Sequence, residues 1–420
     1  MRKALFLTCL GMLVSVCPAT AEVTYTKEIS RILGDRCVQC HRPGDIAPFS
    51  LLTYEDAAGY APDIKRVVEG GIMPPWKPTE SHGKFKGAYA LKPEEKIDLL
   101  SWIDGGTPKG DDADLAPPAE PKGEWLLGDP DLVVKMPVAF APTRGKDVYR
   151  CFVLPTGIDA DKFVSAVDIL PGNRKLVHHV ILYLDSSGDA EKLDAQDEEA
   201  GYDCYGGPGF AIDTSNLVSL LLNGYALGGW APGTRPSYLP TGIGMKLGKQ
   251  ARIVMQVHYY TNGRSGEDQT SVGIYFNKEK VDKQLYYLPV VQTKLNIPAG
   301  EAAYEATAAF PVIPFLEMQV INIFPHMHLL GTRIEVTKSY KGESERMILI
   351  DKWDFNWQGP YTYENPVKMP AGSSVNLKCT YDNSVNNPKN PNNPLKDVKW
   401  GEGTEDEMCL AFAGIIFERF

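Results

Sequence analysis

Residues 175–184 read Lys-Leu-Val-His-His-Val-Ile-Leu-Tyr-Leu, a run of branched and aromatic side chains that predicts a β-strand carrying two adjacent histidines. Comparable runs, separated by turns rich in Pro, Gly and Asn, lie at residues 131–136, 251–260 and 318–324. This spacing of short strands predicts β-sandwiches from about Gly123 onward. Because about 300 residues is large for one sandwich, we expect two, divided near Lys280.

Five of the seven histidines fall in two clusters within this β-rich region. His326 and His328 lie two residues apart on a predicted strand, so both imidazoles point to one face and can bind the same metal ion. Met408 would add a thioether, a soft ligand that favours copper(I) over zinc or magnesium. Two histidines and one methionine leave an open position for dioxygen. We therefore predict a catalytic copper site at these three residues.

The other cluster, formed by His178, His179 and His258, is harder to interpret. Adjacent residues on a regular strand face opposite sides, so His178 and His179 reach one metal ion only where the strand is distorted. The alternative is that one is a ligand and the other a hydrogen-bonded strand residue. His258 lies on another predicted strand and, together with the first cluster, favours a second copper site.

The stretch Cys37-Val-Gln-Cys40-His41 has the pattern that attaches haem covalently in c-type cytochromes. The two thiols would bind one haem and His41 would ligate its iron. A redox-active cysteine pair followed by an unrelated histidine is the alternative. Met73 is the predicted second axial ligand, with core packing as its alternative role, and His82 is its rival.

A small all-α domain is predicted around this motif. Residues 92–106 predict a helix with a proline in its first turn, a glycine stop, and apolar Ile97, Leu100 and Ile103 at helical spacing. The predicted order is a signal peptide over residues 1–21, a cytochrome c domain over 22–110, an acidic, Pro-rich linker over 111–125, and two all-β sandwiches over 126–280 and 281–420.

The first 21 residues predict a cleaved signal peptide, because Arg2 and Lys3 precede an apolar run and Ala19-Thr-Ala21 is a small-residue cleavage site. The apolar run is too short to span a bilayer, and no later segment is apolar enough. We therefore expect a periplasmic or secreted protein without a membrane span. The net charge of -10 argues against a nucleic acid partner.

Four cysteines remain outside the signal peptide and the haem motif: Cys151, Cys204, Cys379 and Cys409. An even number in an exported chain predicts two disulfides. The residues alone leave three pairings open.

Six short motifs carry further information: Val177-His-His-Val, Trp230-Ala-Pro-Gly, Gln256-Val-His-Tyr, Pro325-His-Met-His-Leu-Leu-Gly, Lys378-Cys-Thr-Tyr and Asp406-Glu-Met-Cys. Together they resemble the catalytic core of the type II copper, ascorbate-dependent monooxygenases, a family that includes peptidylglycine α-hydroxylating monooxygenase and dopamine β-monooxygenase. The resemblance extends from about Leu126 to the C-terminus and leaves the predicted haem domain outside it.

The resemblance implies a role for each cluster. The His178, His179 and His258 cluster looks like the ligands of an electron-transfer copper, and the other copper would bind dioxygen and hydroxylate substrate. The implied fold is two jelly-roll-like sandwiches with one copper on each, facing across a solvent-filled cleft. Cys409 follows the methionine ligand, as in the family, and Cys379 is its implied disulfide partner.

The same resemblance leaves Cys151 to pair with Cys204. Tyr149 and Gln256 match positions near the electron-transfer copper of the family. Ordinary strand positions explain both residues equally well.

Three residues depart from the peptide-amidating members of the family, which bind a substrate carboxylate through an Arg, an Asn and a Tyr. Phe324, Leu410 and Phe412 stand at the matching positions. A buried carboxylate needs polar partners, so an apolar wall here predicts a more apolar substrate.

These observations predict a two-copper monooxygenase that hydroxylates a C–H bond of a small organic molecule with dioxygen. Electrons would enter through one c-type haem, delivered by a reductant or a redox protein. One alternative keeps the enzyme but has ascorbate or another small molecule as the donor. A second alternative is a non-catalytic electron-transfer protein that carries haem and copper.

Overall fold

The computed structural model describes residues 22–43, 45–79, 82–115, 124–143, 147–210, 225–249, 251–261 and 263–419. The predicted signal peptide, residues 1–21, lies outside this part of the chain, as do residues 116–123 of the predicted linker.

The N-terminal part forms a small helical unit. Its elements are the π-helix η1 (Tyr25–Ile29), α1 (Ser30–Arg36), α2 (Tyr54–Gly59), α3 (Ala61–Glu69), α4 (Pro93–Asp104) and the 3-10 helix η2 (Asp112–Asp114). The predicted helix is α4, and Glu95 accepts a hydrogen bond from the Lys92 backbone at its start. Leu99 and Trp102 are buried, and Leu100 and Ile103 pack partly buried against the same core, whereas Ile97 is 64% exposed. The helix therefore packs on the side opposite to Ile97.

The first β-sandwich consists of two five-stranded sheets, ordered β1-β9-β3-β7-β10 and β5-β2-β8-β4-β6. The strands are β1 (Leu132–Lys135), β2 (Asp147–Pro155), β3 (Lys162–Leu170), β4 (Val177–Asp185), β5 (Tyr202–Asp203), β6 (Ala226–Trp230), β7 (Ile243–Leu247), β8 (Arg252–Tyr260), β9 (Ser271–Phe276) and β10 (Lys283–Gln284), and the helix α5 (Asp189–Asp194) follows β4. The two sheets enclose an apolar core that includes Phe152, Leu182 and Val257.

The second β-sandwich consists of two four-stranded sheets, ordered β11-β20-β14-β17 and β13-β18-β15-β16, with a separate β12-β19 pair. The strands are β11 (Tyr286–Val291), β12 (Asn296–Ile297), β13 (Tyr304–Pro311), β14 (Glu317–His326), β15 (Gly331–Tyr340), β16 (Glu343–Ile350), β17 (Tyr361–Met369), β18 (Ser374–Tyr381), β19 (Val398–Lys399) and β20 (Leu410–Arg419). The chain crosses between the sandwiches at Leu285, because β10 pairs with β7 and β11 pairs with β20.

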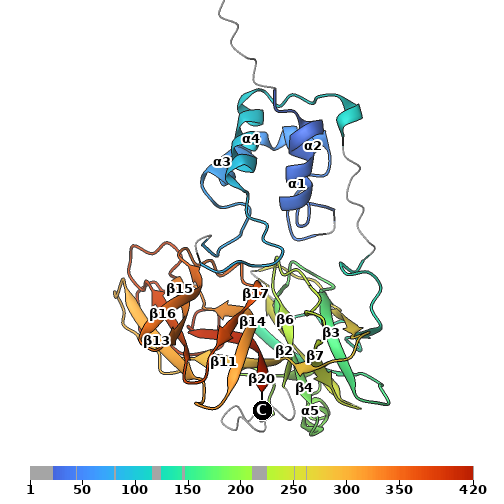
Figure 1. The fold of residues 1–420 in the computed structure, drawn as a ribbon, viewed down its shortest axis with the longest axis vertical. Coiled ribbons are helices and arrows are strands. Elements are labelled where there is room, and N and C mark those ends of the chain that lie inside the picture. The colour runs from blue at the N-terminus through green and yellow to red at the C-terminus, as the bar shows by residue number, and fades with distance from the viewer. Residues whose placement is uncertain are drawn as a thin grey trace, which may run out of the picture.

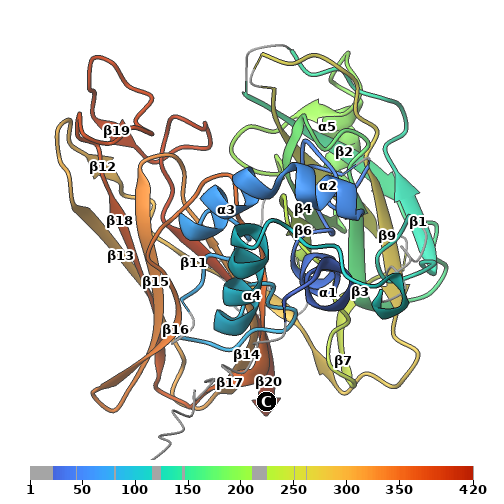
Figure 2. The ribbon, with the colours of Figure 1, turned by 90° about the horizontal axis from the view of Figure 1, so that it is seen from above.

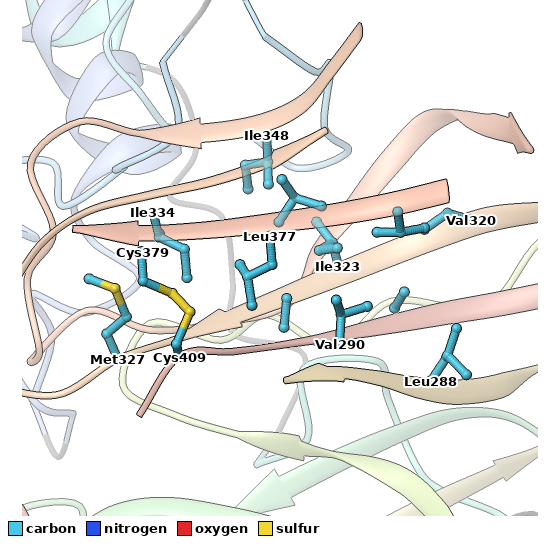
Figure 3. Packing of buried hydrophobic residues seen from close by; sticks show 14 of the residues in the cluster. Leu288, Val290, Val320, Ile323, Met327, Ile334, Ile348, Leu377, Cys379 and Cys409 are labelled. Carbon is cyan, nitrogen blue, oxygen red and sulfur yellow. A yellow bond between two sulfur atoms is a disulfide. The ribbon is translucent and has the colours of Figure 1, made fainter. Parts of the chain in front are cut away.

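Two disulfides lie inside the sandwiches. Cys151 is bonded to Cys204 in the first, and Cys379 to Cys409 in the second. These are the pairs that the resemblance implied. Figure 3 shows the second disulfide in the buried core beside Met327, where it joins the start of β20 to β18. It therefore fixes the segment that carries Met408.

The helical unit lies over the junction of the two sandwiches (Figures 1 and 2). Residues 76–79 and 82–89, which we term the docking segment, attach it to the second sandwich. Within this segment Phe85 forms a β-bridge with Tyr363, and the Lys86 backbone donates to Thr362 on the edge strand β17. On the side of the first sandwich, Arg174 pairs with Asp45 at 3.4 Å. The unit is thus fixed to both sandwiches.

This attachment is stronger than a flexible linker alone would give. Trp76 packs edge-on against Tyr89 and Tyr361 at 5.1 and 5.3 Å between ring centroids, and Lys77 pairs with Asp354 at 3.4 Å.

Among the described residues, no helix is both long and apolar enough to cross a membrane.

Candidate metal centre

The histidines of the first cluster lie on two neighbouring strands, β4 and β8. The pairing of these strands shifts register between Val177 and His179, so a bulge falls at His178. This is the distortion that two adjacent histidines need to reach one ion. The Nδ1 atoms of His178 and His179 are 3.2 Å apart, and His258 brings a nitrogen within 4.8 Å of both.

His258 is oriented by a carboxylate behind it. Its Nε2 lies 3.2 Å from Oδ1 of Asp147, so a neutral imidazole donates this hydrogen and keeps its lone pair on Nδ1. The Tyr149 ring stacks on the other side at 4.2 Å between centroids. The Nδ1 atom of His258 is buried and has no hydrogen-bond partner among the described residues, so it is placed to bind an ion.

In the second cluster, both histidines direct Nε2 toward a common point. His326 directs Nδ1 to Gln358 Oε1 at 2.5 Å, and His328 directs Nδ1 to the Asp406 carbonyl at 3.0 Å. Both oxygens only accept, so each Nδ1 carries the hydrogen and each Nε2 has a free lone pair. The two Nε2 atoms are 3.2 Å apart. Two lone pairs at this distance repel unless a cation lies between them.

The strand assignment here needs one correction. β14 ends at His326, so His328 lies in the following turn and not on the predicted strand. The buried carboxylate of Glu407 shapes this turn, accepting the backbone N–H groups of His328 and Leu330 at 2.9 and 2.6 Å. It also accepts the N–H of Met408 at 3.3 Å, which ties the turn to the methionine segment.

All five clustered histidines are neutral at pH 7. Burial lowers the pKa of His326 to about 4 and that of His328 to about 3. Burial also lowers the pKa of His178, His179 and His258. Neutral imidazoles keep the lone pairs that a metal ion needs.

The two clusters lie next to each other, which corrects the expected solvent-filled cleft. The rings of His179 and His326 are 6.0 Å apart between centroids. Phe355 stacks on His178 at 4.3 Å and meets His328 edge-on at 5.9 Å. A side chain, and not solvent, therefore fills the space between these two imidazoles.

Comparison with known families agrees with this geometry. Residues 133–265 match the N-terminal domain of the copper type II ascorbate-dependent monooxygenases, and residues 282–415 match the C-terminal domain. The chain belongs to this family. The two matches cover more than half of the chain and confirm the resemblance seen in the sequence. Neither includes residues before 133, so the helical unit lies outside them.

Individual monooxygenases show the same extent of similarity. The human putative DBH-like monooxygenase protein 2 is 24% identical over 63% of this chain and 52% of its own length. The peptidyl-glycine alpha-amidating monooxygenase A of Xenopus laevis is 26% identical over 60% of this chain and 25% of its own. Rat dopamine beta-hydroxylase is 21% identical over 66% and 44%. This chain thus spans about half or less of the relatives that it matches.

The residues of both clusters fit the copper that this family uses. Each cluster offers neutral nitrogens with free lone pairs, and hydrogen bonds from behind hold His258, His326 and His328 in place. The orphaned Nδ1 of His258 and the paired Nε2 atoms of His326 and His328 are the observations that require a cation. A cation in each cluster would replace the 3.2 Å nitrogen–nitrogen contacts between His178 and His179 and between His326 and His328.

A cavity of about 1020 Å³ lies between the helical unit and the first cluster. Cys37, Cys40, His41 and Met73 line it on one side, and His178 lines it on the other. Both thiols are unpaired. Nδ1 of His41 lies 3.2 Å from the Phe49 carbonyl, so its Nε2 is free to bind a metal ion.

His82, the rival axial ligand, is engaged elsewhere. Its Nε2 accepts a hydrogen bond from Arg346 of the second sandwich at 2.8 Å. It does not line the cavity that contains the Cys-x-x-Cys-His motif, whereas Met73 does.

The two candidate residues near the first copper site have different positions. Tyr149 stacks on His258, and its hydroxyl donates to the Glu402 carbonyl at 2.5 Å. Gln256 donates to the Cys204 carbonyl at 3.1 Å, so its amide is directed to the disulfide. Only Tyr149 touches a clustered histidine.

Sequence reasoning missed the residues that hold the histidines from behind: Asp147, Phe355, Gln358 and Glu407. No spacing rule connects position 147 with 258, or 358 with 326, because these contacts exist only in the folded chain. For Glu407 there was a signal, since a carboxylate directly before Met408 lies in the matching motif.

Proposed function

We propose that this protein is an exported copper monooxygenase that hydroxylates a C–H bond of a small, apolar organic substrate. The overall reaction takes one dioxygen, two electrons and two protons, and yields the hydroxylated product and one water. The observation that carries the proposal is the pair of adjacent histidine clusters whose free nitrogens converge.

The residues of the two clusters have separate roles in this proposal. His178, His179 and His258 hold the copper that receives electrons. His326, His328 and Met408 hold the copper that meets dioxygen. When bound, the two ions would supply reductive activation of dioxygen. The protein keeps the imidazoles neutral by burial and fixes their tautomers through Asp147, Gln358 and the Asp406 carbonyl.

A c-type haem would occupy the cavity of the helical unit. Cys37 and Cys40 would hold it covalently, and His41 and Met73 would be its axial ligands. The group would supply a one-electron redox centre. Its support is the cavity itself, which joins the Cys-x-x-Cys-His motif to His178 without an intervening layer of protein. Because the unit is docked on both sandwiches, electron entry here needs no swinging domain.

The face of the sheet beside His326 supports an apolar substrate. Phe324 and His326 are two residues apart on β14 and therefore lie on one face of the sheet. Their partners on β20, Phe412 and Leu410, point to the same face. Both Phe324 and Leu410 are only half-buried. Val291 follows on β11 opposite Leu410 and is 37% exposed. These side chains form an apolar surface next to the proposed catalytic copper.

Export is supported by the two disulfides, which persist in oxidising compartments such as the periplasm. The predicted signal peptide is consistent with this destination and remains a proposal.

The decisive experiment is product analysis under ¹⁸O₂ with the copper-loaded protein and a panel of small apolar and carboxylate-bearing compounds. We expect one ¹⁸O atom in the product and substrate-dependent oxygen uptake, with apolar compounds preferred. Oxygen uptake that no compound stimulates would favour the non-catalytic electron-transfer protein instead.

A second experiment concerns the haem. The absorption spectrum of the exported protein should show haem that resists extraction with acidified acetone, and Cys37→Ala/Cys40→Ala should abolish it. Pre-reduced haem, mixed with oxygen and substrate, should be reoxidised at the rate of product formation, and His258→Ala should slow this step. Haem that stays reduced while ascorbate supports turnover would establish the small-reductant alternative.

A further inference from the structure

The loop of residues 353–358, between β16 and β17, contacts residues of both histidine clusters. Trp353 donates its Nε1 hydrogen to the His328 carbonyl at 3.1 Å. Gln358 accepts from His326 at 2.5 Å and donates to the Phe355 carbonyl at 2.8 Å. One short loop of the second sandwich is thus bonded to both histidines of its own cluster.

The same loop reaches into the first sandwich through Phe355. This ring is 4% exposed and stacks nearly parallel on His178, with 4.3 Å between centroids and 17° between planes. It meets Tyr260 edge-on at 6.3 Å and His328 edge-on at 5.9 Å. A residue of one sandwich therefore covers a face of an imidazole that belongs to the other.

Within the described part of the chain, His178 lacks the kind of hydrogen bond from behind that holds His258, His326 and His328. His258 is held by Asp147, and both His326 and His328 are held through Nδ1. The Nε2 atom of His178, by contrast, is buried without a hydrogen-bond partner among the described residues. Besides the 3.2 Å contact of its Nδ1 with Nδ1 of His179, aromatic contacts orient its ring, and the nearly parallel partner is Phe355.

We propose that Phe355 is a positioning residue that holds His178 and thereby sets the distance between the two copper sites across the boundary of the sandwiches. The inference rests on the proposed copper sites for its function, although the contact itself does not require a metal. Gln358 and Trp353 fix the loop of Phe355 to the turn that carries His326 and His328. The position of that turn therefore determines where the Phe355 ring contacts His178.

The test compares Phe355→Leu, which keeps an apolar side chain but removes the ring, with Phe355→Tyr, which keeps the ring. Phe417→Leu is the matched control, because Phe417 is a buried ring (6% exposed) seven positions further along β20 from Leu410. The full-length protein is loaded with copper(II) alone, and pulsed electron paramagnetic resonance measures the separation of the two ions. In metal-free protein, the rate of His178 modification by diethyl pyrocarbonate is measured by mass spectrometry.

We expect one short, narrow distance in the wild type, Phe355→Tyr and Phe417→Leu, and a broader, longer distribution in Phe355→Leu. His178 should be modified at least several-fold faster in Phe355→Leu only. An unchanged distance and unchanged modification in Phe355→Leu would overturn the inference. If copper fails to bind His326 and His328 at all, the proposed function is wrong, and the modification rate in metal-free protein still decides the role of Phe355.

Discussion

Replacing Asp147 with alanine should weaken the first copper site and loosen the contact between the sandwiches at the same time. Asp147 accepts a hydrogen bond from His258 Nε2 at 3.2 Å, from the Thr404 backbone at 2.9 Å and from the Thr404 hydroxyl at 3.0 Å. Asp147 lies on β2 of the first sandwich, whereas Thr404 lies just before β20 of the second. One carboxylate thus orients a histidine and joins two domains.

The loss in free energy of unfolding follows from the hydrogen-bond donors of His258 and Thr404 that Asp147→Ala leaves without an acceptor. The His258 ring and the Thr404 backbone are both buried, and an unsatisfied buried donor costs about 1–3 kcal/mol. Because the Asp147 side chain is 23% exposed, water reaches part of the gap, and we expect a total near the low end, about 2 kcal/mol. Loss of the hydrogen-bond partner of a metal-binding histidine weakens metal affinity about 10–100-fold.

The assay is copper(I) affinity by competition with a chelator, together with thermal unfolding of the metal-free protein. Asp185→Ala is the control, since Asp185 also accepts several local hydrogen bonds but lies at the far end of β4 from the histidines. We expect both variants to unfold earlier and only Asp147→Ala to bind copper more weakly. Wild-type affinity at the first site in Asp147→Ala would refute the orienting role and leave only the link between the sandwiches.

Three further predictions concern the second cluster. Met408→Ile should lower copper(I) affinity there and leave the circular dichroism spectrum unchanged. Hydroxylation should fall by more than the ~100-fold that loss of a ligand's hydrogen-bond partner costs, because here a ligand itself is removed. Turnover near the wild-type rate would make Met408 a packing residue only. Glu407→Gln should lower the free energy of unfolding by about 2–4 kcal/mol in chemical denaturation. The amide has one accepting oxygen and cannot accept all the backbone hydrogen bonds that both oxygens of Glu407 accept. An unchanged free energy of unfolding would contradict this. Metal-free protein should become less stable to unfolding as the pH falls from about 6.5 toward about 4. The reason is that His326 and His328 bind protons in the unfolded chain, whereas burial keeps them neutral in the folded state. A free energy of unfolding that does not change over this range would show that these histidines are not buried in the neutral form.

The sequence was sufficient for the parts of this site that local geometry controls. Two adjacent histidines on a strand required the bulge that occurs at His178. His326 and His328 converge as predicted, although His328 lies beyond the end of β14 and the strand spacing does not explain it. The β-sandwiches and helix α4 follow from periodicity in the same way. Periodicity alone did not show which apolar residues of α4 are buried, because Ile97 has the same helical spacing as Leu100 and Ile103 yet is 64% exposed.

The distance between the clusters could not be read from the sequence. It depends on the loop with Phe355, whose contact with His178 joins residues far apart in the chain. The expected solvent-filled cleft came from resemblance alone, which gives the two domains but not how closely they approach each other. The position of the helical unit also depends on tertiary contacts, since the aromatic residues of the docking segment have no periodic pattern.

The docking segment also bears on how the isolated sandwiches would behave. β17 is the edge strand of its sheet, and in the intact chain Lys84, Phe85 and Lys86 cover part of that edge. A shortened protein that begins after the helical unit would leave the outer edge of β17 unpaired and would uncover the rings of Tyr361 and Tyr363, which are buried in the intact chain. Open strand edges with aromatic flanks recruit strands from other molecules. We therefore expect the helical unit to protect this sheet from self-association, and the two sandwiches produced without it should aggregate.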